Sequence, residues 1–187
     1  LTEGRPRVTD ILVHGGEDQA NLKEMGRALL ALAASLEAGS EQPLAEAILK
    51  AAEEEGVSYR DAQDFEALAG RGIQGRVSLE DSFWGQGPGL GLAGNLRLMK
   101  EKGVVISPDV QAQAEDLAGQ GKTPMYFALN GRLVGLVAAQ DPVKTSSRQA
   151  ILAMEERGLD PIMVTGDHAM TARAMALTLG MDHVEAE

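Results

Sequence analysis

The sequence predicts an α+β domain, with an antiparallel sheet flanked by helices, inserted into a partial α/β domain. Two strand-like runs flank Asn130-Gly131, the strongest short signal for a two-residue hairpin turn. From about residue 140 the pattern changes to helix, strand and helix, the order of a parallel α/β unit. Both ends of the chain belong to this second pattern, as an insertion requires. The predicted segments are residues 1–7 and 140–187 for the α/β domain and residues 8–139 for the inserted domain.

The first elements of the inserted domain are predicted as a strand followed by two helices. Residues 8–14 alternate as a strand does, and residues 18–36 repeat apolar side chains at helical spacing. Pro43 lies where proline is tolerated, in a first helical turn, with Ser40 as a plausible cap just before it. The expected buried stripe of this second helix is Leu44, Ala47, Ile48 and Ala51.

The middle of the inserted domain combines strands with glycine-rich connections. Residues 62–68 and 73–79 are predicted strands, joined at Gly70-Arg71-Gly72, where glycine permits positive φ and close approach of a ligand to the backbone. Residues 85–94 hold five glycines and a proline. We expect this stretch to be an irregular connection before a helix at residues 96–101.

The return into the α/β domain begins after the hairpin, which covers residues 124–139. A helix over 146–157, a buried strand over 161–164 and a helix over 170–179 are predicted. Thr165-Gly166-Asp167 stands between the last two elements. A strand-to-helix junction of this kind can receive a phosphate group.

Composition excludes several classes of function. The formal charge of −11 and the pI near 4.7 argue against nucleic acid as a partner, because phosphate-backbone binding depends on clustered Lys and Arg. The sequence contains no cysteine, and its three histidines are too scattered to predict a metal site. No apolar run approaches the ~20 residues of a membrane-spanning helix, so we expect this chain to be soluble.

Several short motifs, in this order, resemble the heavy-metal-transporting class of P-type ATPases, and copper exporters in particular. In that family the phosphorylated Asp heads the motif Asp-Lys-Thr-Gly-Thr-Leu-Thr-Glu-Gly. The resemblance implies that the partial α/β domain has a haloacid-dehalogenase-like fold and that the inserted domain binds nucleotide. The matching segments are Leu1-Thr2-Glu3-Gly4, Ser40-Glu41-Gln42-Pro43-Leu44, Gly70-Arg71-Gly72, Gly94-Asn95, Asp141-Pro142-Val143-Lys144 and Thr165-Gly166-Asp167.

The resemblance implies ATP, or ADP, as the ligand of the inserted domain. Glu37 would accept a hydrogen bond from the adenine amino group, while Gly70 and Gly72 would leave space for the ring and the phosphates. The pair Gly94-Asn95 would lie near the ribose or phosphates, where the amide can donate and accept. Gln42 departs from the family, which has His at this position. Gln lacks the aromatic face, so the resemblance implies weaker ATP binding than in His-bearing relatives.

The same resemblance implies an incomplete catalytic site. Thr165 and Gly166 would contact the transferred phosphoryl group, and Asp167 would lie close to Mg²⁺. The nucleophilic Asp would precede Leu1, and the main Mg²⁺ ligands would follow Glu187. We therefore expect this chain to bind ATP without forming the aspartyl-phosphate. Its implied partners are the transmembrane, actuator and remaining phosphorylation parts of a pump, at the cytoplasmic face of a membrane.

Two other interpretations remain open from the sequence. A soluble phosphatase of the same α/β superfamily with a large cap domain would share Thr165-Gly166-Asp167, but not the pairing of Gln42-Pro43 with the glycine turn. A non-enzymatic acidic interaction module would use a charged helix such as the one carrying Glu53-Glu54-Glu55. Nucleotide titration separates the module from the ATP-binding interpretation.

Overall fold

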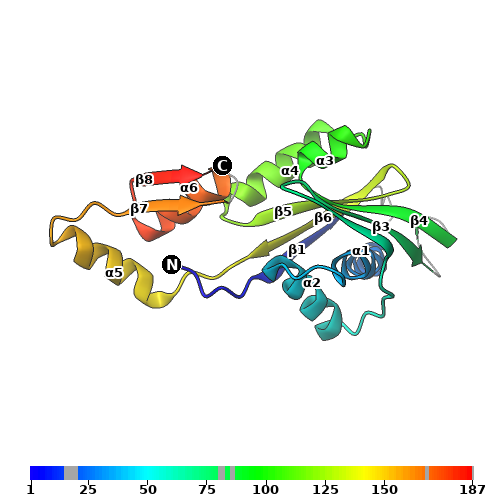
Figure 1. The fold of residues 1–187 in the computed structure, drawn as a ribbon, viewed down its shortest axis with the longest axis horizontal. Helices are drawn as coiled ribbons and strands as arrows, with labels where there is room; N and C mark the ends of the chain where they lie inside the picture. The colour runs from blue at the N-terminus through cyan, green and yellow to red at the C-terminus, as the bar shows by residue number, and fades with distance from the viewer. Residues whose placement is uncertain (15–20, 80–82, 85–86, 167–168, 187) are drawn as a thin grey trace.

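The computed structural model describes residues 1–14, 21–79, 83–84, 87–166 and 169–186. A six-stranded sheet with helices on both faces occupies one end of the molecule, and a two-stranded sheet with two helices occupies the other (Figure 1). This arrangement confirms the predicted fold class. None of the helices in the described residues is long and apolar enough to cross a membrane.

The large sheet is antiparallel throughout, with strand order β1-β6-β5-β4-β3-β2. The hairpin between β5 and β6 confirms the prediction, since Asn130 and Gly131 both have positive φ, 50° and 77°. The Oδ1 of Asn130 also accepts a hydrogen bond from the amide of Leu90 at 2.9 Å. The strands are β1 (Arg7–Val13), β2 (Gln63–Leu68), β3 (Gly72–Leu79), β4 (Gly87–Gly94), β5 (Thr123–Leu129) and β6 (Arg132–Gln140).

Two helices cover each face of this sheet (Figure 1). Helices α1 (Leu22–Glu37) and α2 (Pro43–Glu54) pack on one face, and α3 (Leu96–Glu101) and α4 (Pro108–Gly119) pack on the other. Strand β5 shows the division clearly, because Phe127 faces α1 while Tyr126 and Ala128 face α3 and α4. The two apolar cores lie on either side of a single sheet.

Helix α2 differs in detail from its prediction. Pro43 is the first helical residue, as predicted, but Gln42 rather than Ser40 is the N-cap, and its side chain makes no capping bond. The Ser40 hydroxyl instead accepts from the amide of Gln42 at 3.4 Å. The buried stripe is shifted by one residue at each end, since Ala45 and Ala52 are buried where Leu44 and Ala51 are half-buried.

The prediction of an irregular connection over residues 85–94 is wrong for its described part. Residues 87–94 form β4, in the interior of the sheet between β3 and β5. Glycine is a poor strand former, which is why its density suggested a loop. The glycines are required by close packing instead: a Cβ on Gly91 would lie 3.0 Å from Leu36, and one on Gly89 would lie 2.8 Å from the Asn130 side chain.

Helix α4 was not anticipated from the sequence. It begins at Pro108, and the Oγ of Ser107 accepts a hydrogen bond from the amide of Val110 at 3.4 Å. Serine followed by proline is a typical helix start, so the signal was present. The helix packs on α6 as well as on β5, and so contacts both parts of the molecule.

The smaller part comprises α5 (Thr145–Glu155), β7 (Ile162–Thr165), α6 (Ala169–Leu179) and β8 (His183–Ala186), with β7 and β8 parallel. The predicted helices and the strand are present, and β8 is additional. The prediction that this strand is buried is wrong: Met163 is buried, but Ile162 and Val164 are 59% and 79% exposed. In the described residues β7 pairs with β8 alone, so few neighbours cover its faces.

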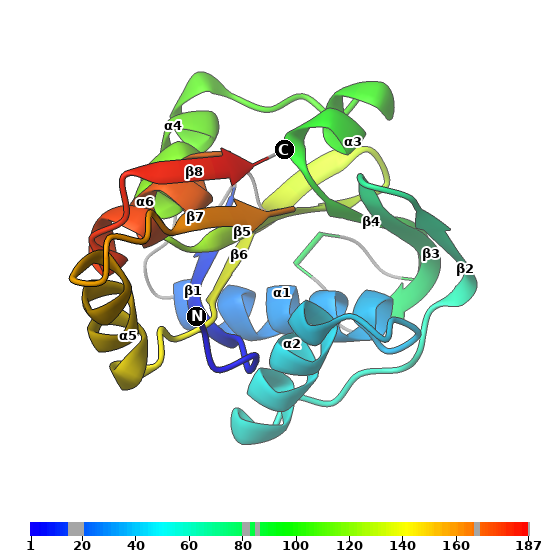
Figure 2. The same ribbon diagram turned by 60° about the vertical axis from the view of Figure 1, so that its left-hand side comes forward.

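The two chain segments that connect the parts lie against each other (Figure 2). The carboxylate of Asp141 accepts hydrogen bonds from the amides of Gly4 at 3.1 Å and Arg5 at 3.0 Å. The carbonyl oxygen of Leu1 accepts from the Ser147 hydroxyl at 2.7 Å. These contacts are consistent with an inserted domain, and the proposed boundary near residue 140 stays a prediction.

Candidate functional site

The glycine turn between β2 and β3 is built so that two backbones touch. Gly72 is opposite Gly94 in the β3–β4 pairing. A Cβ on Gly72 would overlap the carbonyl oxygen of Ala93, and one on Gly94 would overlap that of Arg71. Gly70 differs, because a Cβ there would meet open space and only its φ of +67° favours glycine. Gly72 and Gly94 therefore allow the close approach of β3 and β4, whereas Gly70 lines a cleft.

Asn95 connects this turn to helix α3. Its Oδ1 accepts from the amide of Leu98 at 3.1 Å, which caps the helix, and its Nδ2 donates to the carbonyl oxygen of Gly70 at 2.9 Å. The amide of Asn95 also donates to the carbonyl oxygen of Arg71 at 2.9 Å. The side chain holds the turn in place, and in this arrangement it acts as a helix cap.

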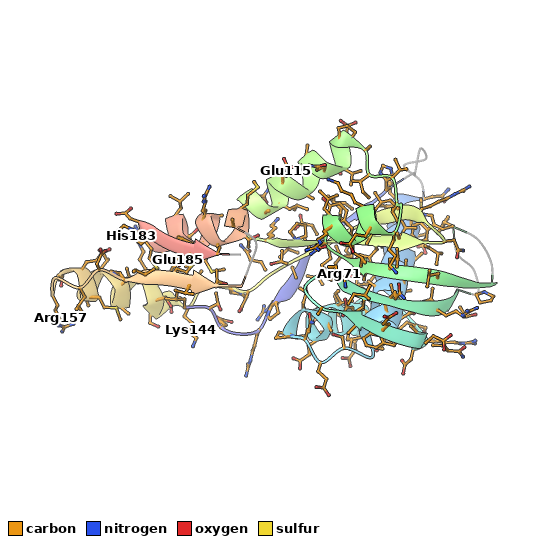
Figure 3. The ribbon with its side chains drawn as sticks, turned by 45° about the horizontal axis from the view of Figure 1, so that its top comes forward. Arg71, Glu115, Lys144, Arg157, His183 and Glu185 are labelled. Carbon is orange, nitrogen blue, oxygen red and sulfur yellow. The ribbon has the colours of Figure 1, made fainter. Side chains whose placement is uncertain are left out.

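Arg71, between the two glycines, is held by an acidic side chain of α3. Figure 3 shows it at the end of the large sheet that faces the smaller part. Its guanidinium pairs with Glu101 at 2.8 Å, and Arg97 pairs with the same carboxylate at 2.9 Å. The hydrogen bond from Arg71 lowers the pKa of Glu101 most, and the hydrogen bond from Arg97 lowers it further. The turn thus carries a cation that shares one carboxylate with a second arginine, so the three groups together keep a net positive charge.

Glu37 is a buried carboxyl group at the end of α1. Its side chain is only 6% exposed, and it is the last residue of the helix. Burial raises the pKa of Glu37 to about 7, and a hydrogen bond with the Ser40 hydroxyl partly opposes this. A carboxylate at a helix C-terminus also faces the negative end of the helix dipole, which acts in the same direction as burial.

Gln42 and Thr165 line one open cleft of about 640 Å³ between the two parts of the molecule. Gln42 is exposed and stands at the start of α2, while Thr165 is half-buried at the end of β7. The connecting segments contribute Leu1, Thr2 and Asp141 to the same cleft. Residues predicted for base binding and for phosphate binding, 123 positions apart in the numbering (165 − 42), thus share a cavity.

A second cleft, of about 490 Å³, brings Gly70 and Asn95 together with Gly166. Helix α4 lines it with Gln111 and Glu115, which sequence reasoning did not assign to any site. Tyr126 also lines it, and burial, followed by the charge of Glu115, raises the pKa of this phenol. Figure 3 shows Glu115 on α4. Because the sequence did not predict α4, it offered no reason to place these side chains here.

The remaining predicted residue, Asp167, lies outside the described residues. Within the described part of the chain, no group of three or more His, Cys, Asp or Glu could hold a metal ion. Each cleft therefore brings predicted nucleotide-site residues next to the end of β7. Gln42 shares one cleft with Thr165, and Gly70 and Asn95 share the other with Gly166.

A family model described as haloacid dehalogenase-like hydrolase matches residues 1–187. The chain belongs to this hydrolase family. Within it, the chain is similar to metal-transporting P-type ATPases. It is 43% identical to a copper-transporting P-type ATPase of Rhizobium leguminosarum bv. viciae, over 100% of this chain and 20% of that protein. It is 38% identical to a silver exporting P-type ATPase of Salmonella typhimurium, again over 100% of this chain and 20% of that protein.

The structure of this haloacid dehalogenase-like chain also resembles a solved pump. A crystal structure of a zinc-transporting PIB-type ATPase in its E2·Pi state matches with a TM-score of 0.66 and 27% identity, covering 100% of this chain and 27% of that one. These matches confirm the resemblance to heavy-metal-transporting P-type ATPases. The chain spans about a fifth of the length of the curated relatives it matches.

Proposed function

We propose that this chain is the ATP-binding cytosolic portion of a P-type ATPase that translocates a heavy metal, with copper as the favoured ion. The observation that carries the proposal is the convergence of predicted base-binding and phosphate-binding residues on the same clefts. Gln42 and Thr165 line one cleft, and Gly70, Asn95 and Gly166 line the other. Copper is favoured because the relative with 43% identity is a copper transporter.

ATP would lie with its adenine toward Glu37 and Gln42 and its phosphates toward Thr165. A base in this position would meet the buried carboxyl group of Glu37 at the end of α1. Gly70, which lines the second cleft, would leave space for the ring and the phosphates, because no side chain occupies the space above its backbone. Phosphoryl transfer depends mainly on positioning and charge compensation, so these residues would orient the γ-phosphate toward an Asp outside this chain.

Mg²⁺ accompanies ATP in phosphoryl transfer and compensates phosphate charge. The described residues do not form a site for this ion on their own, since no group of three or more suitable side chains is present among them. Asp167, which we propose to lie near the ion, is outside the described residues.

Isothermal titration of the chain with ATP and with ADP, each with and without Mg²⁺, tests the proposal. Binding of both nucleotides with little dependence on Mg²⁺ is expected, because the base supplies the anchor. Incubation with γ-labelled ATP should leave no acid-stable phosphate on the protein. Absence of binding at millimolar nucleotide, both by this chain and by Gln42→His, would favour the interaction-module interpretation instead.

We also propose that the nucleotide-binding domain comprises residues 8–139 and that a boundary lies near residue 140. Strand β6 ends at Gln140, and the connecting segments meet there through Asp141. Limited proteolysis followed by mass spectrometry should cut near this position and leave a resistant core. A first cut inside the large sheet would contradict the boundary.

A further inference from the structure

The turn that follows α4 touches α6 and so joins the two parts of the molecule (Figure 1). The hydroxyl of Thr171 on α6 donates to the carbonyl oxygen of Lys122 at 3.0 Å, and Thr171 is only 3% exposed. Gly121 is buried next to Ala174, since a Cβ on Gly121 would lie 3.8 Å from the Cβ of Ala174. These four residues, Gly121, Lys122, Thr171 and Ala174, are called the α4–α6 contact below.

The α4–α6 contact lies between the two clefts. Thr171, and Thr123 directly after Lys122, line both the cleft of about 640 Å³ and the cleft of about 490 Å³. Residues on either side of them line one cleft each, with Gly121 in the first and Met170 in the second. The contact therefore forms the wall that the two clefts share.

This wall divides residues that one nucleotide would have to meet together. Thr165 and Gly166 are consecutive, yet Thr165 lines the first cleft and Gly166 the second. Gln42 lies with Thr165, and Asn95 lies with Gly166. A single ATP molecule can contact all four residues only where the two clefts are joined. Joining them requires α6 to separate from the turn that follows α4.

The α4–α6 contact can open without disturbing the other connection between the parts. That connection consists of residues 1–7 and 140–144, which hold each other through the bridge between Thr2 and Val143 and through the carboxylate of Asp141. The α4–α6 contact is made instead by one neutral hydrogen bond and the packing of small side chains. A neutral hydrogen bond of this kind is readily exchanged for one to water.

We propose that the α4–α6 contact is an autoinhibitory latch, which keeps the two clefts apart in the nucleotide-free chain and opens when ATP binds. This inference rests on the proposed ATP-binding function and specifies how that site is regulated. A ligand shifts an equilibrium only by its preference for one of the two states, so the closed latch lowers the observed affinity in proportion to the fraction of open molecules. Fixing the latch should weaken ATP binding, and loosening it should strengthen ATP binding.

An engineered disulfide tests the effect of a fixed latch, because the chain contains no cysteine of its own. Gly121→Cys combined with Ala174→Cys would bridge the contact, since the Cβ separation of 3.8 Å lies within the range of about 3.5–4.5 Å that a disulfide needs. The oxidised protein should bind ATP about tenfold more weakly than the same protein after reduction. The two single variants control for the substitutions themselves. Equal or tighter binding in the oxidised protein would overturn the proposal.

Thr171→Val tests the opposite change, because it removes the hydroxyl and nearly keeps the shape of the side chain. It should bind ATP about fivefold more tightly than the unmodified chain. Thr178→Val is a matched control on the same helix, since the Thr178 hydroxyl is exposed and donates to the carbonyl oxygen of Ala174 within α6 at 3.0 Å. Its affinity should be unchanged. Unchanged or weaker binding by a folded Thr171→Val variant would contradict the latch.

Thiol labelling of Ala174→Cys separates a failure of the latch from a failure of the proposed function. The half-buried position should react faster when Thr171→Val is added, and faster in the presence of ATP. Labelling rates that do not respond to Thr171→Val would overturn the latch whatever the nucleotide result. Faster labelling with Thr171→Val, but no binding of ATP or ADP by any variant, would instead contradict the proposed function and with it the inhibitory role of the contact.

Discussion

The side-chain amide of Asn95 donates a hydrogen bond to the carbonyl oxygen of Gly70 at 2.9 Å, joining two motifs that lie 25 residues apart. The same side chain caps α3 through the amide of Leu98. One residue therefore fixes both the start of a helix and the rim of the proposed nucleotide site. A defect at Asn95 should appear as a loss of stability as well as a loss of binding.

We predict that Asn95→Ala lowers the free energy of unfolding by about 1–2 kcal/mol, because the helix loses its cap and the turn loses a donor. Asn95→Asp keeps an oxygen that can cap the helix but has no donor for Gly70. In urea denaturation, the stability of Asn95→Asp should lie between that of the unmodified chain and that of Asn95→Ala. If Asn95→Asp and Asn95→Ala are equally unstable, capping is not the main contribution of this side chain.

The two glycines of the turn should respond differently to alanine. Gly72→Ala would force a Cβ into the backbone of β4 and should cost more than about 3 kcal/mol, enough to prevent folding of part of the protein. A Cβ in Gly70→Ala would meet open space, so the loss in free energy of unfolding should come mainly from the positive φ and should be about 1–2 kcal/mol.

A matched control for the cost of positive φ is Gly103→Ala. Gly103 follows α3, with φ of +73° and open space around it. Thermal and urea unfolding of the three variants should give similar losses for Gly70→Ala and Gly103→Ala. A loss for Gly72→Ala as small as theirs would contradict the backbone contact between β3 and β4.

Folding stability should depend on the titration of Glu37 even without nucleotide. The pKa of Glu37 is raised from 4.5 to about 7 in the folded chain, so the folded state binds more protons than the unfolded state between these values. The neutral Glu37 carboxyl group contributes fully to the free energy of unfolding below about pH 4.5, and this contribution is lost as pH rises toward 7. Glu37→Gln should therefore be more stable than the unmodified chain above pH 7, by up to roughly 3 kcal/mol. Urea denaturation at several pH values measures this gain, and equal stability at pH 8 would contradict the burial of the carboxyl group.

Lys122 joins both parts of the molecule and should be sensitive to substitution. Its ammonium group pairs with Asp10 at 2.8 Å, and its carbonyl oxygen accepts from the Thr171 hydroxyl on α6 at 3.0 Å. Burial alone would raise the pKa of Asp10, but hydrogen bonds from Lys122 and Thr9, together with the charge of Lys122, lower it overall. The stability from this pair is therefore present above the unfolded pKa of Asp10, near 3.8, and is lost as pH falls through the folded value.

A double-mutant cycle of Lys122→Met and Asp10→Asn measures the pair. We expect a coupling energy of about 1 kcal/mol at pH 7, because both side chains are partly buried, and a decrease in coupling as pH falls through the folded pKa of Asp10. Thr171→Val, which removes the hydroxyl contact with the Lys122 backbone, should leave this coupling unchanged. Coupling that persists at low pH would show that packing, and not charge, links the two side chains.

Gln42→His should strengthen ATP binding about tenfold, the equivalent of a hydrogen bond or stacking contact worth about 1–1.5 kcal/mol. Gln42 is exposed at the start of α2, and its side chain makes no capping bond, so the substitution should leave stability nearly unchanged. Titration calorimetry with ATP measures the gain. Unchanged affinity in the folded variant would show that this position does not contribute to binding.

The sequence predicted elements whose signals are local. The Asn130-Gly131 hairpin depends on two residues with positive φ, and Pro43 at the start of α2 depends on a fixed φ and a missing amide hydrogen. The periodic apolar residues of α1 predicted a helix because burial on one face requires that spacing. Met25, Leu29, Leu32 and Leu36 are buried, whereas Leu22, at the start of the helix, is 42% exposed. The order of the short motifs along the chain was sufficient to indicate the family resemblance.

Long-range packing decided what these signals could not. Strand β4 forms although glycine has a low strand propensity. Its glycines are required because a Cβ on Gly91 or Gly89 would crowd Leu36 or Asn130, which are distant in sequence. The roles of Gln111 and Glu115 at a cleft depended on α4 packing between β5 and α6. The raised pKa of Glu37 arises from burial at the end of α1.

The sequence by itself predicted the hairpin and the helices other than α4, and it supplied two hypotheses: the insertion of one domain into another and the residues of a nucleotide site. Only the tertiary structure decided that Gln42 shares a cleft with Thr165, and that Gly70 and Asn95 share one with Gly166. The physical reason is that local backbone preferences act over a few residues, whereas clefts and desolvated carboxyl groups are created when segments far apart in the chain exclude water together.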